Sequence, residues 1–219
     1  MMDVEPTTPP LILPLGDQGL LVRFGSALSE EANRRAVAFG RRAMPAGLPG
    51  VVEVVPNLVS VLLRYEPAQV EFERLAGEVR LLVSASGEDL PAGREQAIAM
   101  IFDGEDVDEV AALLDMDREA FVAAHCAAPL RVLATGFAPG FVYLGFHDAR
   151  LHLPRRAAVR RQVPAGTVLF AAGQTAITST PIPTGWRVIG HTDFRNFDPA
   201  RSPPTQLAAA DKVRFEVAR

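Results

Sequence analysis

The stretch Thr135–Thr175 constrains the fold of this chain most, because glycine and proline interrupt it at short intervals. Glycine accepts a positive φ without a Cβ clash, and proline fixes φ and stiffens the turn around it. Turns of this kind between short apolar segments are what a small β-barrel needs. The residues concerned are Gly136, Pro139, Gly140, Gly145, Pro154, Pro164, Gly166 and Gly173. We therefore expect short strands joined by tight turns.

The same stretch could also build a loop-lined ligand pocket, and the residue types leave both interpretations open. Aromatic residues stand between the glycines, namely Phe137, Phe141, Tyr143 and Phe146. Arginines follow them, namely Arg150, Arg155, Arg156, Arg160 and Arg161. Glycines let backbone N–H groups approach a ligand, and guanidinium groups match the geometry of carboxylates. The pocket interpretation therefore predicts an anionic or carboxylate ligand.

Charge and composition narrow the classes of protein that this chain can be. Its 219 residues carry a formal net charge of −4, which gives no reason to expect a nucleic-acid partner. There is no run of about 18 apolar residues, so we expect no membrane span. Cys126 is the only cysteine, which fits a reducing compartment. Residues 1–10 lack the features of a secretory signal and are expected to be a disordered tail. We expect a cytoplasmic protein.

Residues 11–88 are predicted to form an N-terminal α/β domain, a ferredoxin-like sandwich, in an α+β protein. The predicted strands are Leu11–Leu15, Gly19–Phe24, Val51–Val55 and Leu58–Tyr65, and the predicted helices are Glu30–Met44 and Ala68–Val83. Ser29 is the expected N-cap of the first helix. A strand at Gln96–Phe102 is expected to close this sheet, beyond a polar linker at Ser84–Gly93. This domain has no cluster of catalytic residue types, so we expect it to act as a scaffold or an interface.

Residues 89–219 are predicted to form the second domain, in which short strands dominate. Two short helices are expected between Asp106 and Ala128, with Asp117 as the N-cap of the second. The clearest strands after them are Leu130–Ala134, Val168–Ala172, Trp186–Gly190 and Lys212–Val217. Many short strands at close spacing indicate a small barrel.

Candidate chemistry is sparse. The amide and hydroxyl of Gln174 and Thr175 could hold a carboxylate or polarise a carbonyl, or simply brace a turn. His191 could be a general base or a structural residue at a strand end.

Other polar residues favour structural interpretations. His125 is predicted to lie in the core or to cap a helix, and Cys126 is not identified as a nucleophile. His147 and His152 lack a third ligand at a fixed spacing, so we predict no metal site. The P-loop pattern is absent, so ATP, if used, would bind elsewhere.

The segments TGFAPGFVYLGF, LHLPRRAAVRRQVPAGTV, AAGQTAI and GWRVIGHTDFRNFDPARSPP resemble the family of bacterial 5-oxoprolinase B subunits. That family is also labelled allophanate hydrolase subunit 1 and includes the KipI-type inhibitor of a sporulation histidine kinase. The resemblance implies a cyclophilin-like β-barrel as the second domain. It also implies two partners, the KipA-like C subunit of the complex together with its A subunit, which is of the lactam-utilisation type.

The same resemblance implies a non-autonomous subunit of an ATP-dependent complex that opens 5-oxo-L-proline, or a related lactam or amide, to L-glutamate. No cofactor is expected on this chain alone, and ATP is used by the complex. Two alternatives remain, a KipI-like inhibitor that binds a sensor histidine kinase and an allophanate hydrolase component of urea degradation. No residue is identified as catalytic. The expected substrate-binding residues are Phe137, Pro139, Gly140, Phe141, Arg155, Gly173, Gln174, Thr175, Trp186 and His191.

Departures from the family pattern fall within these motifs. Ala172 and Ala176 replace glycines, Thr178-Ser179 replaces Tyr-Pro, and His191 replaces an arginine. Each added methyl group narrows the space at the expected ligand loop and restricts positive φ. The departures therefore bear on substrate identity more than on the fold.

Overall fold

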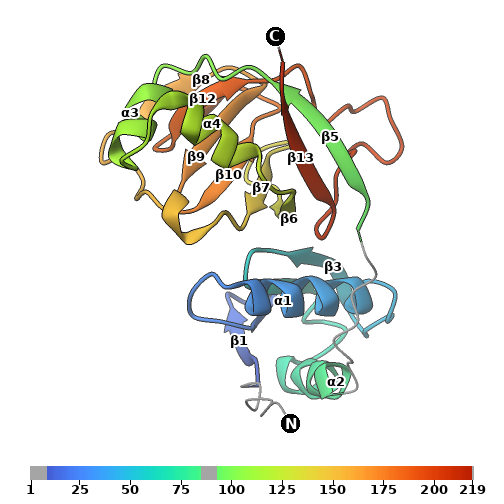
Figure 1. Cartoon of the computed structure of the whole chain (residues 1–219). Coiled ribbons are helices and arrows are strands. Elements are labelled where there is room, and N and C mark those ends of the chain that lie inside the picture. The colour runs from blue at the N-terminus through green and yellow to red at the C-terminus, as the bar shows by residue number, and fades with distance from the viewer. Residues whose placement is uncertain (1–8, 85–92, 219) are drawn as a thin grey trace. The chain divides into compact units, whose positions relative to one another are not determined.

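The computed structural model describes residues 9–84 and 93–218 and divides the chain into two compact units, Met1–Pro91 and Ala92–Arg219 (Figure 1). The predicted boundary after residue 88 and most of the predicted linker lie outside the described residues. So does most of the predicted N-terminal tail.

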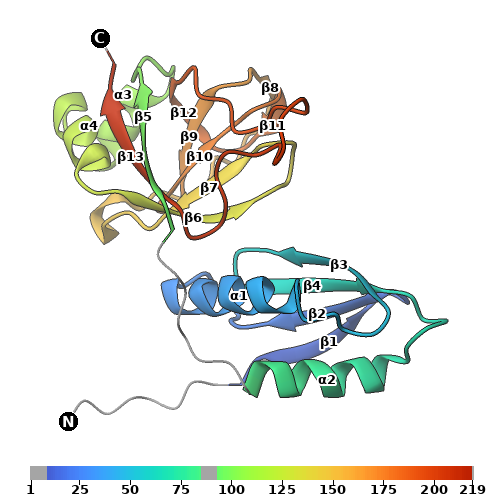
Figure 2. The same cartoon turned by 90° about the vertical axis from the view of Figure 1, so that its right-hand side faces the viewer.

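The first unit is a four-stranded antiparallel sheet with two helices (Figure 2). Its strand order is β1 (Leu11–Leu15), β2 (Gly19–Arg23), β4 (Ser60–Tyr65), β3 (Val51–Pro56). A ferredoxin-like sandwich has the element order βαββαβ, and its last strand lies at the sheet edge beside its first strand. In this unit that pattern starts at β2, and among the described residues no last strand follows α2 in this sheet. Here β1 takes that edge position. The prediction that Gln96–Phe102 closes this sheet is wrong, because that segment pairs within the second unit.

Helices α1 (Glu30–Ala43) and α2 (Phe72–Ser84) cover one face of this sheet. The predicted N-cap is present, since the Ser29 hydroxyl accepts a hydrogen bond from Ala32 N at 3.2 Å. Alternate residues of β2 and β4 are buried, as the two-residue period of a half-buried sheet requires. The core residues are Leu20, Val22, Ala36, Phe39, Ala43, Val61, Leu63, Tyr65, Val70, Leu75, Ala76 and Val79. All of them belong to one cluster, so both helices pack on the same face.

The second unit is built on a seven-stranded sheet of order β12-β9-β10-β7-β6-β13-β5. Its strands are β5 (Glu95–Met100), β6 (Leu130–Thr135), β7 (Val142–Gly145), β9 (Thr167–Ala171), β10 (Gln174–Ile177), β12 (Arg187–His191) and β13 (Lys212–Val217). The β13–β5 pair is parallel and the other pairs are antiparallel. Strands β8 (Arg160–Val163) and β11 (Ile182–Thr184) form a separate two-stranded antiparallel sheet.

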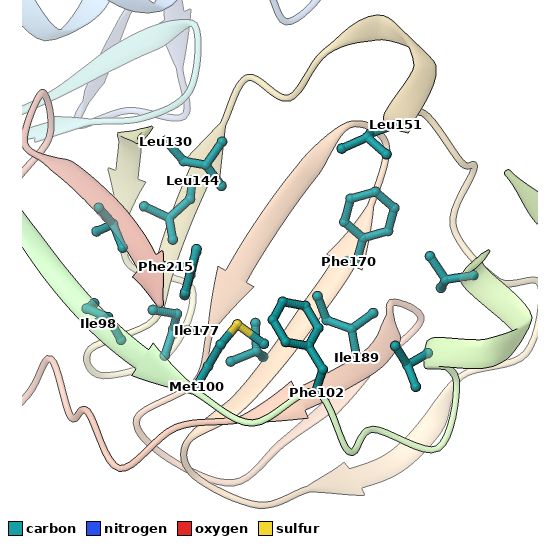
Figure 3. Close-up of a cluster of buried hydrophobic side chains, with 14 of the residues drawn as sticks. Ile98, Met100, Phe102, Leu130, Leu144, Leu151, Phe170, Ile177, Ile189 and Phe215 are labelled. Carbon is teal, nitrogen blue, oxygen red and sulfur yellow. The ribbon is translucent and has the colours of Figure 1, made fainter. Parts of the chain in front are cut away.

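This sheet curls into a half-barrel, and its two edge strands meet at one point. Ile101 and His191, at the ends of β5 and β12, form an isolated antiparallel bridge. The enclosed core combines side chains from β5, β9 and β13, and Figure 3 shows Met100, Phe170 and Phe215 pointing into it. Helices α3 (Val107–Leu113) and α4 (Arg118–Cys126) contribute to the same core. Asp117 is the predicted N-cap of α4, accepting from Ala120 N at 2.7 Å.

The outer face of the sheet carries a second, smaller apolar cluster. It contains Phe141, Val163, Leu169, Ala171, Ala176, Ile182 and Trp186. Val163 and Ile182 come from the two-stranded β8–β11 sheet, so this small sheet covers part of the outer face. The remainder of the outer face carries the candidate site.

Candidate functional site

An open cavity of about 410 Å³ lies along the glycine-rich loop that follows β6. It is lined by Thr135, Gly136, Phe137, Ala138, Pro139, Gly140, Phe197 and Thr205. Gly140 has φ +72°, and a Cβ there would come within 2.4 Å of the Phe197 Cβ. Glycine is therefore required at this close approach of two loops. Three of the predicted site residues, Phe137, Pro139 and Gly140, share this cavity.

Phe137 is unusual within this loop. Its φ is +77°, a region that residues with a Cβ rarely adopt, and its side chain is 72% exposed. The loop is held by two hydrogen bonds at 3.0 Å, from Gly136 N to Phe141 O and from Phe141 N to Ala138 O. A strained backbone that presents an apolar ring to solvent is typical of a binding loop.

A row of aromatic rings continues from Phe137 across the outer face. Ring centroids are 5.5 Å apart for Phe137–Phe141, 4.7 Å for Phe141–Tyr143 and 6.1 Å for Tyr143–Trp186. The Arg155 guanidinium carbon lies 5.5 Å from the Trp186 ring centroid, within cation–π range. Burial raises the pKa of Tyr143, partly offset by the charge of Arg155. The structure thus brings six predicted residues together on one face, namely Phe137, Pro139, Gly140, Phe141, Arg155 and Trp186.

Gln174 and Thr175 do not form one ligand-binding pair, because they are consecutive in β10 and point to opposite faces of the sheet. Ala176, which shares the Gln174 face, packs in the outer cluster with Trp186. Gln174 is only 5% exposed, and its Oε1 has no hydrogen-bond partner within residues 9–84 and 93–218. Thr175 is fully buried on the inner face. Gly173, with φ +69°, forms the preceding hairpin turn.

His191 lies apart from the aromatic row. Its Nδ1 is 2.8 Å from Asp103 Oδ1, and it lines a separate cavity of about 210 Å³ with residues 97–101 and 192–194. Its backbone joins the sheet edges. Because His191 lies where the two edge strands β5 and β12 meet, its position favours a structural role over that of a general base.

Most arginines of the basic stretch are paired with acidic side chains. Arg156 and Arg160 both bind Asp106, which is 3% exposed at the start of α3, and Arg150 pairs with Asp148. Burial acts to raise the pKa of Asp106, but hydrogen bonds from Arg160 and Val188 N hold it below its usual value. Within the described chain only Arg155 and Arg161 of this stretch lack an acidic partner. An anion pocket built from five arginines is therefore not present.

The inner face holds a polar cluster that sequence reasoning missed. The Thr175 hydroxyl lies 2.8 Å from the Nε2 atoms of both His125 and His147. His125 is 1% exposed, as its predicted core position requires. Burial lowers the pKa of His125 well below its usual value, with the charge of His147 a further cause, and burial lowers the pKa of His147 to about 4. Both histidines are therefore neutral near pH 7.

Neither a metal site nor a reactive thiol appears in the described chain. No three His, Cys, Asp or Glu side chains gather there in a way that could hold a metal ion. Burial raises the pKa of the Cys126 thiol to about 11, so the thiolate nucleophile is not available near pH 7.

Comparison with known proteins identifies the family. The model of the carboxyltransferase domain, subdomain C and D, matches residues 10–207. The B subunit of 5-oxoprolinase from Bacillus subtilis is 31% identical over 92% of this chain and 90% of its own length. The chain belongs to the family of 5-oxoprolinase B subunits. Another family member, from Escherichia coli O157:H7, is 32% identical over 92% of this chain and 93% of its own length.

Solved structures extend the comparison to longer chains. The crystal structure of the protein TTHA0988 matches with a TM-score of 0.81 and 37% identity, over 92% of this chain and 40% of that chain. Urea amidolyase of K. lactis matches with a TM-score of 0.79 over 95% of this chain and 15% of its own, at 16% identity, which shows a shared fold. In both proteins the matched region is less than half of the chain. In the described chain, no helix has the length and apolar character to span a membrane.

Proposed function

We propose that this protein is the B subunit of an ATP-dependent complex that opens 5-oxo-L-proline to L-glutamate. The observation that carries the proposal is its similarity, along more than nine tenths of the chain, to curated proteins named as B subunits of 5-oxoprolinase. The proposed partners are the KipA-like C subunit, together with the A subunit of the lactam-utilisation type. The complex acts in the cytoplasm and consumes the ATP, and this chain binds no cofactor by itself.

The outer face offers contacts that suit this substrate. Within the aromatic row, the exposed Phe137 ring and the half-buried Tyr143 ring provide apolar surface for a five-membered lactam ring, and the buried Phe141 and Trp186 rings support them. Arg155 provides a cation for the carboxylate. Gln174 adds a buried amide with an unused oxygen. We further propose that the second unit is the cyclophilin-like domain of the family and that its half-barrel carries these contacts.

The chain is proposed to act only within the complex. Cys126 is held as a thiol, and no P-loop pattern occurs in the sequence. The matched region in TTHA0988 is part of a chain more than twice as long, which is consistent with a unit that works beside further domains.

Reconstitution tests this proposal. The chain is co-expressed with the A and C subunits, while glutamate release and ATP hydrolysis are measured with 5-oxo-L-proline as substrate. We expect activity from the complex and none from the isolated chain. Arg155→Ala should reduce activity, whereas Arg161→Ala, at an exposed position outside the aromatic row, should not. A complex that releases no glutamate, or an isolated chain that inhibits a histidine kinase instead, would contradict the proposal.

A further inference from the structure

The inner-face cluster of His125, Thr175 and His147 fixes where the protons lie. A threonine hydroxyl has one hydrogen to donate and can accept from others. Both Nε2 atoms lie 2.8 Å from the same Oγ1, and the described residues form no other hydrogen bond with this hydroxyl. If both rings donated to Oγ1, the hydroxyl hydrogen would be left without an acceptor. One neutral histidine therefore donates to Thr175 and the other accepts from it, which leaves two arrangements of the protons.

The surroundings of His125 distinguish the two arrangements. Its ring is enclosed by Phe102, Phe121, Phe170 and Phe215, with centroid separations of 5.2–6.3 Å. Its Nδ1 is buried and has no hydrogen-bond partner in the part of the chain that the structure describes. A buried N–H without a partner is rarer than a buried acceptor without one. The proton of His125 therefore lies on Nε2 and is donated to Thr175.

The proton on His147 follows from this assignment. Thr175 donates its single hydroxyl hydrogen to Nε2 of His147, so the proton of the neutral His147 ring lies on Nδ1. His147 is only partly buried, and its Nδ1 is not among the buried nitrogens without partners. No hydrogen bond to this atom is formed by the described residues. The cluster thus presents an N–H donor of fixed tautomer at the surface.

His147 lies beside the tip of the β9–β10 hairpin. His147 N donates to Gly173 O at 3.2 Å, and on the other side of the tip Ala172 N donates to Leu153 O at 2.5 Å. Leu153 is two residues before Arg155. The hairpin tip therefore brings both segments to one end of the sheet, although His147 contacts Thr175 on the inner face and Arg155 stacks on Trp186 on the outer face. A ligand that contacts both side chains has to lie across this end of the sheet.

We infer that His147 is a substrate-contacting residue whose Nδ1–H donates a hydrogen bond to the lactam carbonyl oxygen of 5-oxo-L-proline. This inference rests on the function proposed above. A neutral imidazole held in one tautomer can stabilise negative charge that develops on a carbonyl oxygen without transferring its proton. The low pKa of His147 keeps the ring neutral across the physiological range. His125 and Thr175 are positioning residues that act through it.

Two substitutions separate this role from a structural one. Glutamine places an amide near the position of Nε2, so His147→Gln keeps the contact with Thr175 and removes the Nδ1 donor. Asparagine places its amide near Nδ1, so His147→Asn keeps the donor and removes the contact with Thr175. In the reconstituted complex with 5-oxo-L-proline, we expect His147→Gln to lower kcat by roughly a hundredfold or more with little change in KM. His147→Asn should retain more activity than His147→Gln, although it loses the contact with Thr175 that positions the donor.

A structural role for His147 predicts the opposite order, since His147→Gln would then be tolerated and His147→Asn would lose stability and activity together. That order, or equal loss in both variants, would overturn the inference. A second measurement does not depend on activity. Nitrogen-15 spectra of the full-length chain, labelled at histidine, should show the proton on Nδ1 of His147 and on Nε2 of His125. An Nε2 proton on His147 would also overturn it, while an inactive wild-type complex would contradict only the proposed function.

Discussion

Ile101 and His191 exchange two backbone hydrogen bonds, each with an N···O distance of 2.9 Å, and so join the two edge strands of the seven-stranded sheet. Thr192 adds a third tie by donating its hydroxyl hydrogen to Ala99 O at 2.7 Å. These contacts fix the curvature of the half-barrel where its two edge strands meet. The two bonds of residue 191 are main-chain bonds, so they do not require a histidine side chain. The arginine that the family pattern places there and the histidine found here are both compatible with these bonds.

The histidine cluster predicts a pH dependence of stability. The folded-state pKa of His147 is about 4, below the ordinary value of 6.5, and that of His125 is also well below it. Between those pH values the unfolded chain binds protons that the folded chain excludes. The free energy of unfolding is therefore highest above about pH 6.5 and falls as the pH drops toward 4. His147 alone accounts for a decrease of roughly 3 kcal/mol. Denaturant titrations at several pH values measure it.

The matched variant for this prediction is His147→Gln, which keeps the contact with Thr175 but cannot be protonated. Its free energy of unfolding should vary less steeply between pH 6.5 and 4 than that of the wild type. Parallel curves for the two proteins would show that His147 does not titrate with a lowered pKa.

Ala172 occupies a position that favours glycine. Its φ is +52°, and with Gly173 at +69° it forms a two-residue hairpin turn in which both central residues have positive φ. Relief of the Cβ clash is partly offset by the greater chain entropy of glycine, so Ala172→Gly should stabilise the protein by roughly 0.5–1 kcal/mol. Thermal unfolding measures the change. The neighbouring Ala171→Gly, in a buried strand position, should instead destabilise.

Asp106 connects the start of α3 to the basic stretch and to β12. It accepts from Arg156, from Arg160 and from Val188 N at 2.7 Å. Asp106→Asn leaves two guanidinium groups without their shared carboxylate. We expect a loss of about 2 kcal/mol, below the roughly 3–5 kcal/mol of a fully buried pair, because the arginine side chains are 28% and 22% exposed. Urea denaturation measures it.

The control is Asp108→Asn, which breaks the exposed ion pair with Arg118. Exposed pairs contribute between about 0 and 1 kcal/mol, so little change is expected. Equal effects of the two substitutions would mean that the shared carboxylate does not hold these elements together.

Phe137 is predicted to act in binding rather than in folding. Because its ring is 72% exposed, Phe137→Ala should change the free energy of unfolding by no more than about 0.5 kcal/mol. The same substitution should weaken substrate turnover or assembly of the reconstituted complex. Phe141→Ala, at a buried ring in the same row, should destabilise by roughly 3 kcal/mol or more. A Phe137 variant that unfolds easily yet assembles normally would contradict this division.

Local patterns predicted many of the elements, but the strands β7, β8, β10 and β11 were not among them. The caps at Ser29 and Asp117 are present, and the strand at Lys212–Val217 has the predicted bounds, because each depends on residues close in sequence. Pairing over long distances was not predictable in this way. The β5 segment is a good strand by composition, but its partner β13 is more than a hundred residues away. The residues within and around β5 do not indicate whether it pairs with β13 or with the sheet of the first unit, which is nearer in sequence.

The candidate site shows the same division. Glycine, proline and aromatic residues indicated the loop at 136–141, and the structure places Trp186 and Arg155 beside its aromatic row. The separation of Gln174 from Thr175 could have been inferred from strand alternation, had β10 been assigned. The contact of His125 with Thr175 could not, because a helix and a strand 50 residues apart meet only in the folded core.

The position of β13 between β6 and the edge strand β5 sets an order on biosynthesis. Residues 212–217 lie between β6 and β5, and β5 has no other long partner in the described sheet. The first unit has all its strands within residues 11–65 and can close early in translation. In contrast, the second unit must hold residues 95–100 unpaired until almost the whole described chain has left the ribosome. That exposed strand is the part of the nascent chain that a chaperone has most reason to cover.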